Sequence, residues 1–324
     1  MNSNYKLSIC IPTYNRAKYL PDLLDSILLQ PSGDKVEILI SDNASTDNTS
    51  EVVSRYKERY QNITYYKESE NLGPDKNYFK AVEISSGHYV WLMGSDDKIV
   101  SDGVLKALNC LKTNKDIYLH NRIECDINMQ NGISRSFWIE NVKKDWDFSE
   151  DNLADYFSSC RSLAGVFSYL SSIVVKKEKW DEFLPPKRYF QTAYSHVYPL
   201  LSILNNKATL QIFHSNIVLC RLGNDYFLQE GECKRILIDY RGYMLLSDDI
   251  FCDDNLEKSA LLKILVYEYP FKKLIKIHSI CRDNFLEEIR LYLRVIDWSS
   301  WKIFFARNLR WIYIVYHLYR CLKK

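Results

Sequence analysis

Residues 36–49 read Val-Glu-Ile-Leu-Ile-Ser-Asp-Asn-Ala-Ser-Thr-Asp-Asn-Thr, a short apolar run followed by a polar loop. An apolar run of this length, bounded by turn-forming residues, predicts a buried strand over residues 36–40. The loop over residues 41–49 ends in side chains that favour helix starts, so a helix is expected to follow as far as Tyr60. Strand, polar loop and helix together are the unit from which parallel sheets with crossover helices are built.

The same unit recurs on both sides of this stretch. Residues 6–11 predict a strand, and the helical spacing of apolar residues that begins at Tyr19 stops at Pro31. Further along, strands are expected at residues 63–66 and 89–93, with a helix at residues 75–84 between them. Ligands of such sheets bind beyond the carboxyl ends of the strands, because loops and helix N-termini converge there. The polar loops of this chain are therefore its candidate site.

The rest of the chain predicts a larger α/β domain with an appended helical region. The 324 residues exceed what one hydrophobic core usually organises. We expect a catalytic α/β domain over residues 1–235 and a helical region over residues 236–324. Within the first, the pattern predicts three more strands and two helices: strands at 117–120, 132–139 and 167–175, and helices from Asp151 and at 176–180.

Composition excludes several functional classes. The net charge of +2 argues against a dedicated nucleic-acid binder, which normally carries a strong basic excess. The nine cysteines are scattered and never spaced as Cys-x-x-Cys, so they indicate neither a disulfide framework nor a zinc site, and they suit a reducing compartment. No run of about 18 apolar residues and no cleavable leader is evident. The protein is expected to be neither exported nor membrane-spanning.

Adjacent aspartates follow the strand at residues 89–93. Gly94-Ser95-Asp96-Asp97 offers two carboxylates at a strand end, and oxygen ligands of this kind suit Mg²⁺ or Mn²⁺ bridging two phosphates. The same residues also suit a turn followed by a helix cap.

Two further loops carry polar side chains at strand ends. Asp42 could accept hydrogen bonds from a nucleobase, whereas Thr46 and Asp47 are explained by helix capping. The loop over residues 71–77, Asn-Leu-Gly-Pro-Asp-Lys-Asn, suits a helix start as well as it suits a ligand.

Taken together, residues 10–16, 41–47, 71–73 and 95–97 resemble the family 2 glycosyltransferases of the GT-A fold. The resemblance implies an α/β, Rossmann-like, mostly parallel sheet with flanking helices, plus the C-terminal helical region. It implies a nucleoside diphosphate sugar as donor and Mn²⁺ or Mg²⁺ as cofactor, held by Asp96 and Asp97. The residues it implies for donor binding are Pro12, Thr13, Asn15, Arg16, Asp42, Asn71, Gly73, Lys76, Asn77, Ser95 and Asp96.

Three later segments further resemble the abequosyltransferases of O-antigen assembly. They are residues 163–181, which include Gly-Val-Phe-Ser-Tyr-Leu-Ser-Ser, the pair Cys220-Arg221, and residues 234–239. This resemblance implies a CDP-linked 3,6-dideoxyhexose as donor and a polyprenyl-diphosphate-linked oligosaccharide as acceptor. It implies a cytoplasmic protein, peripheral on the inner face of the bacterial inner membrane.

The chain departs from the family pattern in two places. The family's acidic motif reads Asp-x-Asp-Asp, but Gly94 stands in its first position. Inverting members carry a Glu-Asp pair downstream, where this chain reads Ala-Tyr-Ser-His-Val-Tyr at residues 193–198. We therefore expect retention of configuration, with Arg221 or Lys76 as cations beside the diphosphate. His196 is either a base or a structural hydrogen-bonding residue.

Two alternatives stay open at this point. One is an inverting transferase that uses a uridine or thymidine diphosphate sugar, because Asp42 could accept from either pyrimidine. The other is a non-catalytic binding module that keeps the nucleotide pocket.

The last two dozen residues are expected to form a basic amphipathic helix. Residues 301–324 contain six Lys or Arg and no acidic residue, with aromatic side chains on the opposite face. Such a helix either packs on the core or lies in the membrane interface, and we favour the interface because cations and aromatic rings suit anionic headgroups.

Truncation after Ser300 tests this helix. The shortened protein should leave the membrane fraction yet keep transfer to a soluble acceptor analogue, and lipid binding of the full chain should weaken with salt because headgroup attraction is screened. Vesicle sedimentation and the transfer assay measure these two properties. An insoluble or inactive truncated protein would place the helix in the core.

Overall fold

The computed structural model describes residues 5–31, 35–134, 138–140, 143–224, 231–252 and 255–280. The chain divides into two compact units. The first comprises Met1–Asn152 and Ala164–Asn224, and the second comprises Leu153–Leu163 and Asp225–Lys324. This division places residues 153–163 with the helical region and begins that region before the predicted boundary at residue 235.

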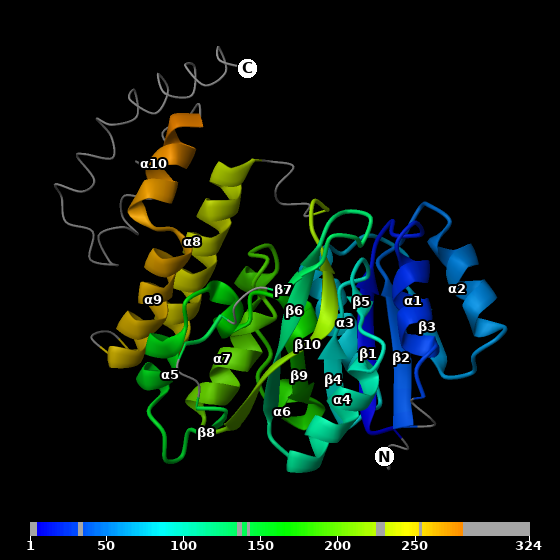
Figure 1. Ribbon diagram of the computed structural model, residues 1–324, viewed down its shortest axis with the longest axis horizontal. Coiled ribbons are helices and arrows are strands. Elements are labelled where there is room, and N and C mark those ends of the chain that lie inside the picture. The colour runs from blue at the N-terminus through cyan, green and yellow to red at the C-terminus, as the bar shows by residue number, and fades with distance from the viewer. Residues whose placement is uncertain are drawn as a thin grey trace. The chain divides into compact units, whose positions relative to one another are not determined.

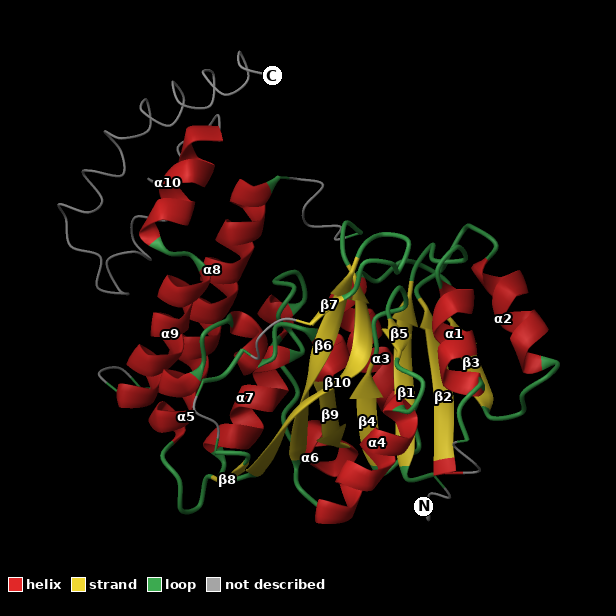
Figure 2. Ribbon diagram, viewed as in Figure 1, coloured by secondary structure: helices red, strands yellow, loops and turns green. Residues whose placement is uncertain are grey.

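The first unit is built on a mixed sheet of ten strands in which β3, β2, β1 and β4 run parallel (Figures 1 and 2). Every residue of the central strand β1 is buried, as a strand covered on both faces requires. The four strands are β1 Leu7–Thr13, β2 Val36–Asp42, β3 Ile63–Lys67 and β4 Tyr89–Leu92. They confirm the strands predicted from the first hundred residues.

Beyond β4 one antiparallel strand interrupts the parallel order of the sheet. Strand β9 is antiparallel to both β4 and β6, whereas β10 is parallel to β6. The carboxyl ends of β1, β2, β4, β6 and β10 therefore share one edge of the sheet with the amino end of β9. The remaining strands are β5 Lys98–Ile99, β6 Ile117–Cys125, β7 Ile133–Ser134, β8 Asp145–Asp147, β9 Ile173–Lys176 and β10 Thr209–Arg221.

Helices cover the sheet of the first unit. Apolar side chains of α1 and α4 join those of the strands in one core. The helices are α1 Leu20–Leu28, α2 Thr49–Lys57, α3 Pro74–Glu83, α4 Gly103–Cys110, α6 Lys177–Asp181 and α7 Val197–Asn205. Short 3-10 turns are η2 Leu111–Thr113, η3 Leu163–Val166, η4 Leu170–Ser172 and η5 Lys187–Tyr189.

The described residues of the second unit are mainly helical, as the resemblance implies. Its helices are α5 Leu153–Ser159, α8 Glu232–Ile250, α9 Leu256–Glu268 and α10 Phe271–Ile280. The Tyr269 hydroxyl donates to the buried carboxylate of Asp239, and the rings of Phe157 and Phe251 meet edge to face at 5.8 Å. Six described cysteines are free thiols, but Cys233 is disulfide-bonded, which the cysteine spacing does not predict.

Two predicted strands are wrong in extent. Within the described residues, the strand predicted at 132–139 is reduced to β7. The strand predicted at 167–175 begins only at Ile173, because Phe167 adopts a left-handed conformation with φ 72° and the chain then turns through η4. The long strand β10 is not predicted by the sequence pattern.

Within the described part of the chain, no helix is both long and apolar enough to cross a membrane. The basic helix predicted at residues 301–324 lies outside the described residues.

Candidate active site

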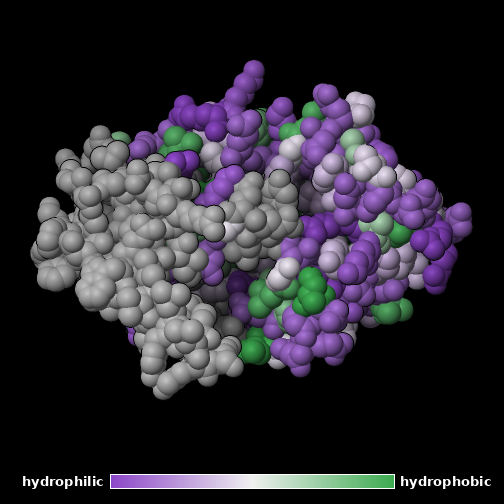
Figure 3. All heavy atoms as spheres, turned by 90° about the horizontal axis from the view of Figure 1, so that it is seen from above, coloured by the Kyte–Doolittle hydropathy of each residue, from purple (hydrophilic) through white to green (hydrophobic). Residues whose placement is uncertain are grey.

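The loops after β1, β2 and β4 meet at one edge of the sheet. Thr13 and Asp42 end neighbouring strands and are paired in the strand register, and the acidic motif begins two residues after β4 ends. Figure 3 looks onto this edge, where the described side chains over α1 and α2 are mainly hydrophilic. The structure thus brings the predicted loops together, as expected for the carboxyl ends of a parallel sheet.

Asp42 is fully buried and holds its own loop. Its Oδ1 accepts the Ser45 N–H at 2.7 Å, and its Oδ2 accepts the Tyr65 hydroxyl at 2.6 Å. Burial, followed by this hydrogen bond, raises the pKa of Tyr65 to about 12. Because the carboxylate does not reach the surface, direct contact between Asp42 and a nucleobase is not available in this conformation.

The first and second loops are tied together by Asn15. Its Oδ1 accepts the backbone N–H of Thr46 at 2.8 Å, and its own N–H donates to the Ser45 hydroxyl at 2.9 Å. Asn15 adopts φ 53°, a left-handed conformation that asparagine tolerates better than most residues. Pro12 and Thr13 are buried behind this loop, and the Thr13 hydroxyl has no hydrogen-bond partner among the described residues.

The third loop is also held by amide side chains. Asn71 Oδ1 accepts from Asn43 Nδ2 at 2.7 Å and from the Gly73 N–H at 2.9 Å. Asn77 is buried, donates to the Ser41 carbonyl at 3.0 Å and accepts the Ser41 hydroxyl. Gly73 has φ 85°, which L-residues rarely adopt, and caps α3. These residues shape the edge, whereas Lys76 is exposed on it.

The two aspartates of the acidic motif point in different directions. The Asp97 carboxylate is buried and accepts three hydrogen bonds: the Arg221 N–H at 3.1 Å, the Tyr169 hydroxyl at 2.8 Å and the Ser171 hydroxyl at 2.6 Å. Burial and then the charge of Asp96 raise the pKa of Asp97, against the effect of those donors. The predicted pairing of Asp96 and Asp97 as metal ligands is therefore at odds with the structure.

Asp96 is the carboxylate that remains at the surface. Its side chain is 23% exposed, and its Oδ2 accepts Asn224 Nδ2 at 2.6 Å and lies 3.9 Å from Arg16 Nη1. Ser95 beside it is buried. The structure thus brings Arg16 and Asp96 together at one edge, with the Arg16 guanidinium beside the carboxylate.

Arg221 acts as a clamp rather than as an open cation. Its side chain is 3% exposed and forms a 2.7 Å ion pair with Asp22. The same guanidinium donates to the carbonyls of Asp96 at 2.8 Å and Ile127 at 2.6 Å, and it lies over the Tyr19 ring. The prediction that Arg221 stabilises the leaving diphosphate does not match this geometry.

His196 is likewise buried at the start of α7. Its Nε2 lies 3.0 Å from the Phe167 carbonyl, so Nε2 carries the proton and Nδ1 is unprotonated. Burial lowers the pKa of His196 to about 4, despite that hydrogen bond. Nδ1 is buried without a described partner. The contact with strained Phe167 supports the structural interpretation of this histidine.

Comparison with known proteins decides the family. A model described as Glycosyl transferase family 2 matches residues 8–165. The abequosyltransferase RfbV of Salmonella typhimurium is 39% identical over 271 residues, which cover 82% of this chain and 81% of that protein. This chain belongs to the family 2 glycosyltransferases.

Two solved structures support the GT-A fold of this glycosyltransferase. S. aureus TarS 1–349 in complex with UDP-GlcNAc gives a TM-score of 0.67 at 16% identity, covering 95% of this chain and 89% of that one. The mannosyltransferase PcManGT of Pyrobaculum calidifontis, in complex with GDP-Man and Mn²⁺, gives 0.54 at 14% identity, covering 97% and 87%. The second of these structures therefore contains both a nucleotide sugar and a divalent metal.

The described residues of the glycosyltransferase fit a divalent cation through one carboxylate. They contain no cluster of three His, Cys, Asp or Glu side chains that could hold a metal alone. Asp96 offers a partly exposed carboxylate, whereas the Asp97 oxygens already accept three hydrogen bonds. A metal at Asp96 therefore needs further oxygen ligands from the donor phosphates and water.

Sequence reasoning missed several residues of the site. Tyr65, Tyr169, Ser171 and Asn224 all bind its carboxylates, and no periodicity or motif marks them. The available signal is that Tyr169 and Ser171 lie in the segment that resembles the abequosyltransferases. Asp75 was also missed: it is buried and accepts the Ser195 hydroxyl at 2.6 Å.

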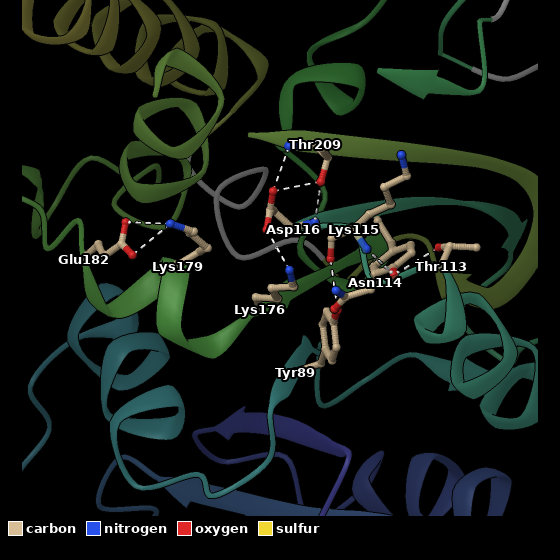
Figure 4. Close-up of polar contacts among 10 residues, drawn as sticks. Tyr89, Thr113, Asn114, Lys115, Asp116, Lys176, Lys179, Glu182 and Thr209 are labelled. Carbon is tan, nitrogen blue, oxygen red and sulfur yellow. Dashed lines mark hydrogen bonds and ion pairs between the residues drawn. The ribbon is translucent and has the colours of Figure 1, made fainter. Parts of the chain in front are cut away.

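A second polar cluster lies at the amino end of β6 (Figure 4). Asp116 accepts from the Thr209 N–H and hydroxyl at 2.8 Å each and from Lys176 at 3.0 Å. A hollow of about 70 Å³ beside it is lined by Asp116, Lys179 and Glu182, among others, and these charges are paired within the cluster. The cluster stabilises the opposite edge of the sheet.

The buried His196 makes stability depend on pH. Its pKa is lowered from 6.5 to about 4. The neutral ring therefore makes its full contribution to the free energy of unfolding above pH 6.5, and this contribution is lost as the pH falls toward 4. His196→Gln keeps a donor for the Phe167 carbonyl but cannot titrate. Between these pH values, the free energy of unfolding of the wild type should fall more steeply than that of the variant, by about 1.4 kcal/mol per pH unit. Denaturant unfolding at several pH values measures both slopes, and parallel curves would contradict the assignment.

Proposed function

We propose that this glycosyltransferase transfers a 3,6-dideoxyhexose from its cytidine diphosphate ester to a polyprenyl-diphosphate-linked oligosaccharide, with retention of configuration. The observation that carries the proposal is the similarity to an abequosyltransferase over most of both chains. The site is compatible with it, because the partly exposed carboxylate of Asp96 lies among cationic and amide side chains at the donor edge.

The donor nucleotide is proposed to lie over the loops that follow β1 and β2. Asn15 and Arg16 form the exposed part of this surface, and Pro12 and Thr13 form its floor. Asp42 acts from inside by fixing residues 42–45, which replaces the direct base contact expected from the sequence. Asn71, Gly73 and Asn77 hold the neighbouring loop, and Ser95 completes the edge beside Asp96.

The diphosphate is proposed to lie between Asp96, Arg16 and Lys76. A divalent cation bound there would neutralise charge on the departing diphosphate. Asp96 would hold that cation, while Asn224 and Arg16 orient the carboxylate. Lys76 is exposed in the first turn of α3, where the helix N-terminus also favours phosphate.

Retention is supported by the environment of His196. An inverting displacement needs a base within about 3 Å of the acceptor hydroxyl. The His196 ring is buried, its Nε2 is taken by the Phe167 carbonyl, and its Nδ1 faces the protein interior. The Asp75 carboxylate in the same region is also buried and accepts a hydrogen bond from the Ser195 hydroxyl. The leaving phosphate is therefore proposed to accept the proton of the acceptor hydroxyl.

The membrane is proposed as the place of action because the acceptor is anchored there. A polyprenyl chain keeps the acceptor diphosphate at the lipid surface, so a transferase that uses it must work at that surface. We propose peripheral association with the inner face of the inner membrane.

Asp96→Asn tests the metal role with little change in shape. The neutral amide should remove the Mn²⁺-dependent gain in cytidine diphosphate affinity and lower kcat at least about 100-fold, as expected when a charge stabiliser is lost. Calorimetry with and without Mn²⁺ measures the first effect. Asp102→Asn is the matched control, since Asp102 pairs with Lys106 on the surface of α4. Full activity of Asp96→Asn, or of the wild type in excess chelator, would refute the role.

The donor and the stereochemistry are tested in one experiment. The wild type is incubated with a lipid-linked acceptor and α-linked cytidine, uridine or guanosine diphosphate sugars, and the product configuration is read by NMR. We expect transfer from the cytidine donor, with an α-linked product. A β-linked product would contradict retention, and equal use of all three donors would count against a dideoxyhexose donor.

A further inference from the structure

A segment far along the chain enters the acidic motif. The Ser171 hydroxyl donates to Asp97 Oδ2 at 2.6 Å and accepts the Gly94 N–H at 2.9 Å. The Tyr169 hydroxyl donates to the same Asp97 oxygen at 2.8 Å. The Ser171 carbonyl is fixed in turn by Trp91 Nε1 at 2.8 Å. One serine hydroxyl thus joins the first and last residues of the motif.

The space over Gly94 is already filled by these groups. A Cβ placed on Gly94 would lie 3.1 Å from Asp97 Oδ2, 3.2 Å from Ser171 Oγ and 3.3 Å from Asp96 Oδ1. All three distances are shorter than ordinary van der Waals contacts. An aspartate at position 94 would also bring a third carboxylate beside two others, which repel it. A side chain at position 94 therefore requires Ser171 and Asp97 to shift by a few tenths of an ångström.

The related acidic motif of the family carries an aspartate where this chain has Gly94. Here a side chain at position 94 would crowd the Ser171 hydroxyl, because its Cβ would lie 3.2 Å from Ser171 Oγ. We propose that Ser171, supported by Tyr169, is a positioning residue that takes the place of the first carboxylate of the motif. It draws Asp97 inward and so presents Asp96 alone to the metal and diphosphate of the donor. This inference rests on the proposed role of Asp96.

Further contacts hold the turn that carries Asp96. The Asp97 N–H donates to the Gly94 carbonyl at 3.2 Å, and the Arg221 N–H holds Asp97 Oδ1 at 3.1 Å. Tyr169 is itself held by the Arg122 guanidinium, whose carbon lies 4.5 Å from the centre of its ring. Loss of the Ser171 hydroxyl would release Asp97 at the point where the turn is tied to η4.

A double-mutant cycle between positions 94 and 171 tests the proposal. Gly94→Asp alone should lower the affinity for cytidine diphosphate with Mn²⁺ at least about tenfold, because the new side chain meets Ser171 and Asp97. In a Ser171→Gly background the same substitution should cost less than about threefold, since the hydroxyl is gone and the new carboxylate has room. Coupling of this size is typical of residues in direct contact. Calorimetry with Mn²⁺ and with chelator separates the metal-dependent affinity from nucleotide binding as such.

Tyr169→Phe is the matched control for the cycle. It removes a hydrogen bond to the same Asp97 oxygen but opens no space at position 94, so Gly94→Asp should remain at least tenfold deleterious in that background. Thermal unfolding of each variant confirms that it is folded. Effects at 94 and 171 that simply multiply would overturn the positioning role while leaving the proposed function intact. If the affinity of the wild type for cytidine diphosphate is the same with Mn²⁺ and with chelator, the proposed metal role and this inference are both overturned.

Discussion

The buried carboxylate of Asp97 is the constraint on which the site depends. An ionised carboxylate taken out of water is destabilising unless donors surround it. Here the donors come from the end of β10, from η4 and from the residue before η4. The need to satisfy one charge therefore fixes three parts of the first unit that are remote in sequence. Their common position is the edge of the sheet where Asp96 reaches the surface.

Arg221 extends this constraint from Asp97 to the neighbouring loops. Its backbone N–H binds Asp97, and its side chain binds Asp22 and the carbonyls of Asp96 and Ile127. A single residue at the end of β10 therefore sets the positions of α1, the acidic turn and the loop after β6. Removal of such a buried, paired charge is strongly destabilising because its partners are left without compensation. The Arg221 guanidinium, a group that often binds phosphate, therefore holds these loops together instead.

The sequence predicted the first half of the fold well because its signals are local. Apolar runs and helical spacing identify β1 to β4 and the helices between them, and parallel order then places their loops at one edge. The family resemblance names the loops that the structure brings together at this edge. Neither could predict that Asp97 turns inward while Asp96 stays exposed, since adjacent residues differ only in which partners meet them in space. The strand β10 was missed because its polar residues, such as His214 and Asn216, interrupt the apolar pattern at the bulge beside β6. Tyr169 and Ser171 carry no local signal, because their role exists only once η4 packs against β4.

The predicted donor-binding residues divide into those that meet the surface and those that hold it. The polar atoms of Asp42, Asn71 and Asn77 form hydrogen bonds with neighbouring backbone and side chains. The loops are therefore ordered without a donor. Pre-ordered loops lower the entropy that binding must offset. The same arrangement limits what buried groups can select, because a carboxylate fixed inside cannot distinguish one pyrimidine from another. In the proposed placement of the donor, recognition of the base depends on exposed side chains such as Tyr14 and Asn15 and on the backbone that Asp42 holds in place. The buried acids Asp42 and Asp97 thus determine the shape of the surface on which the proposed donor would meet the exposed groups.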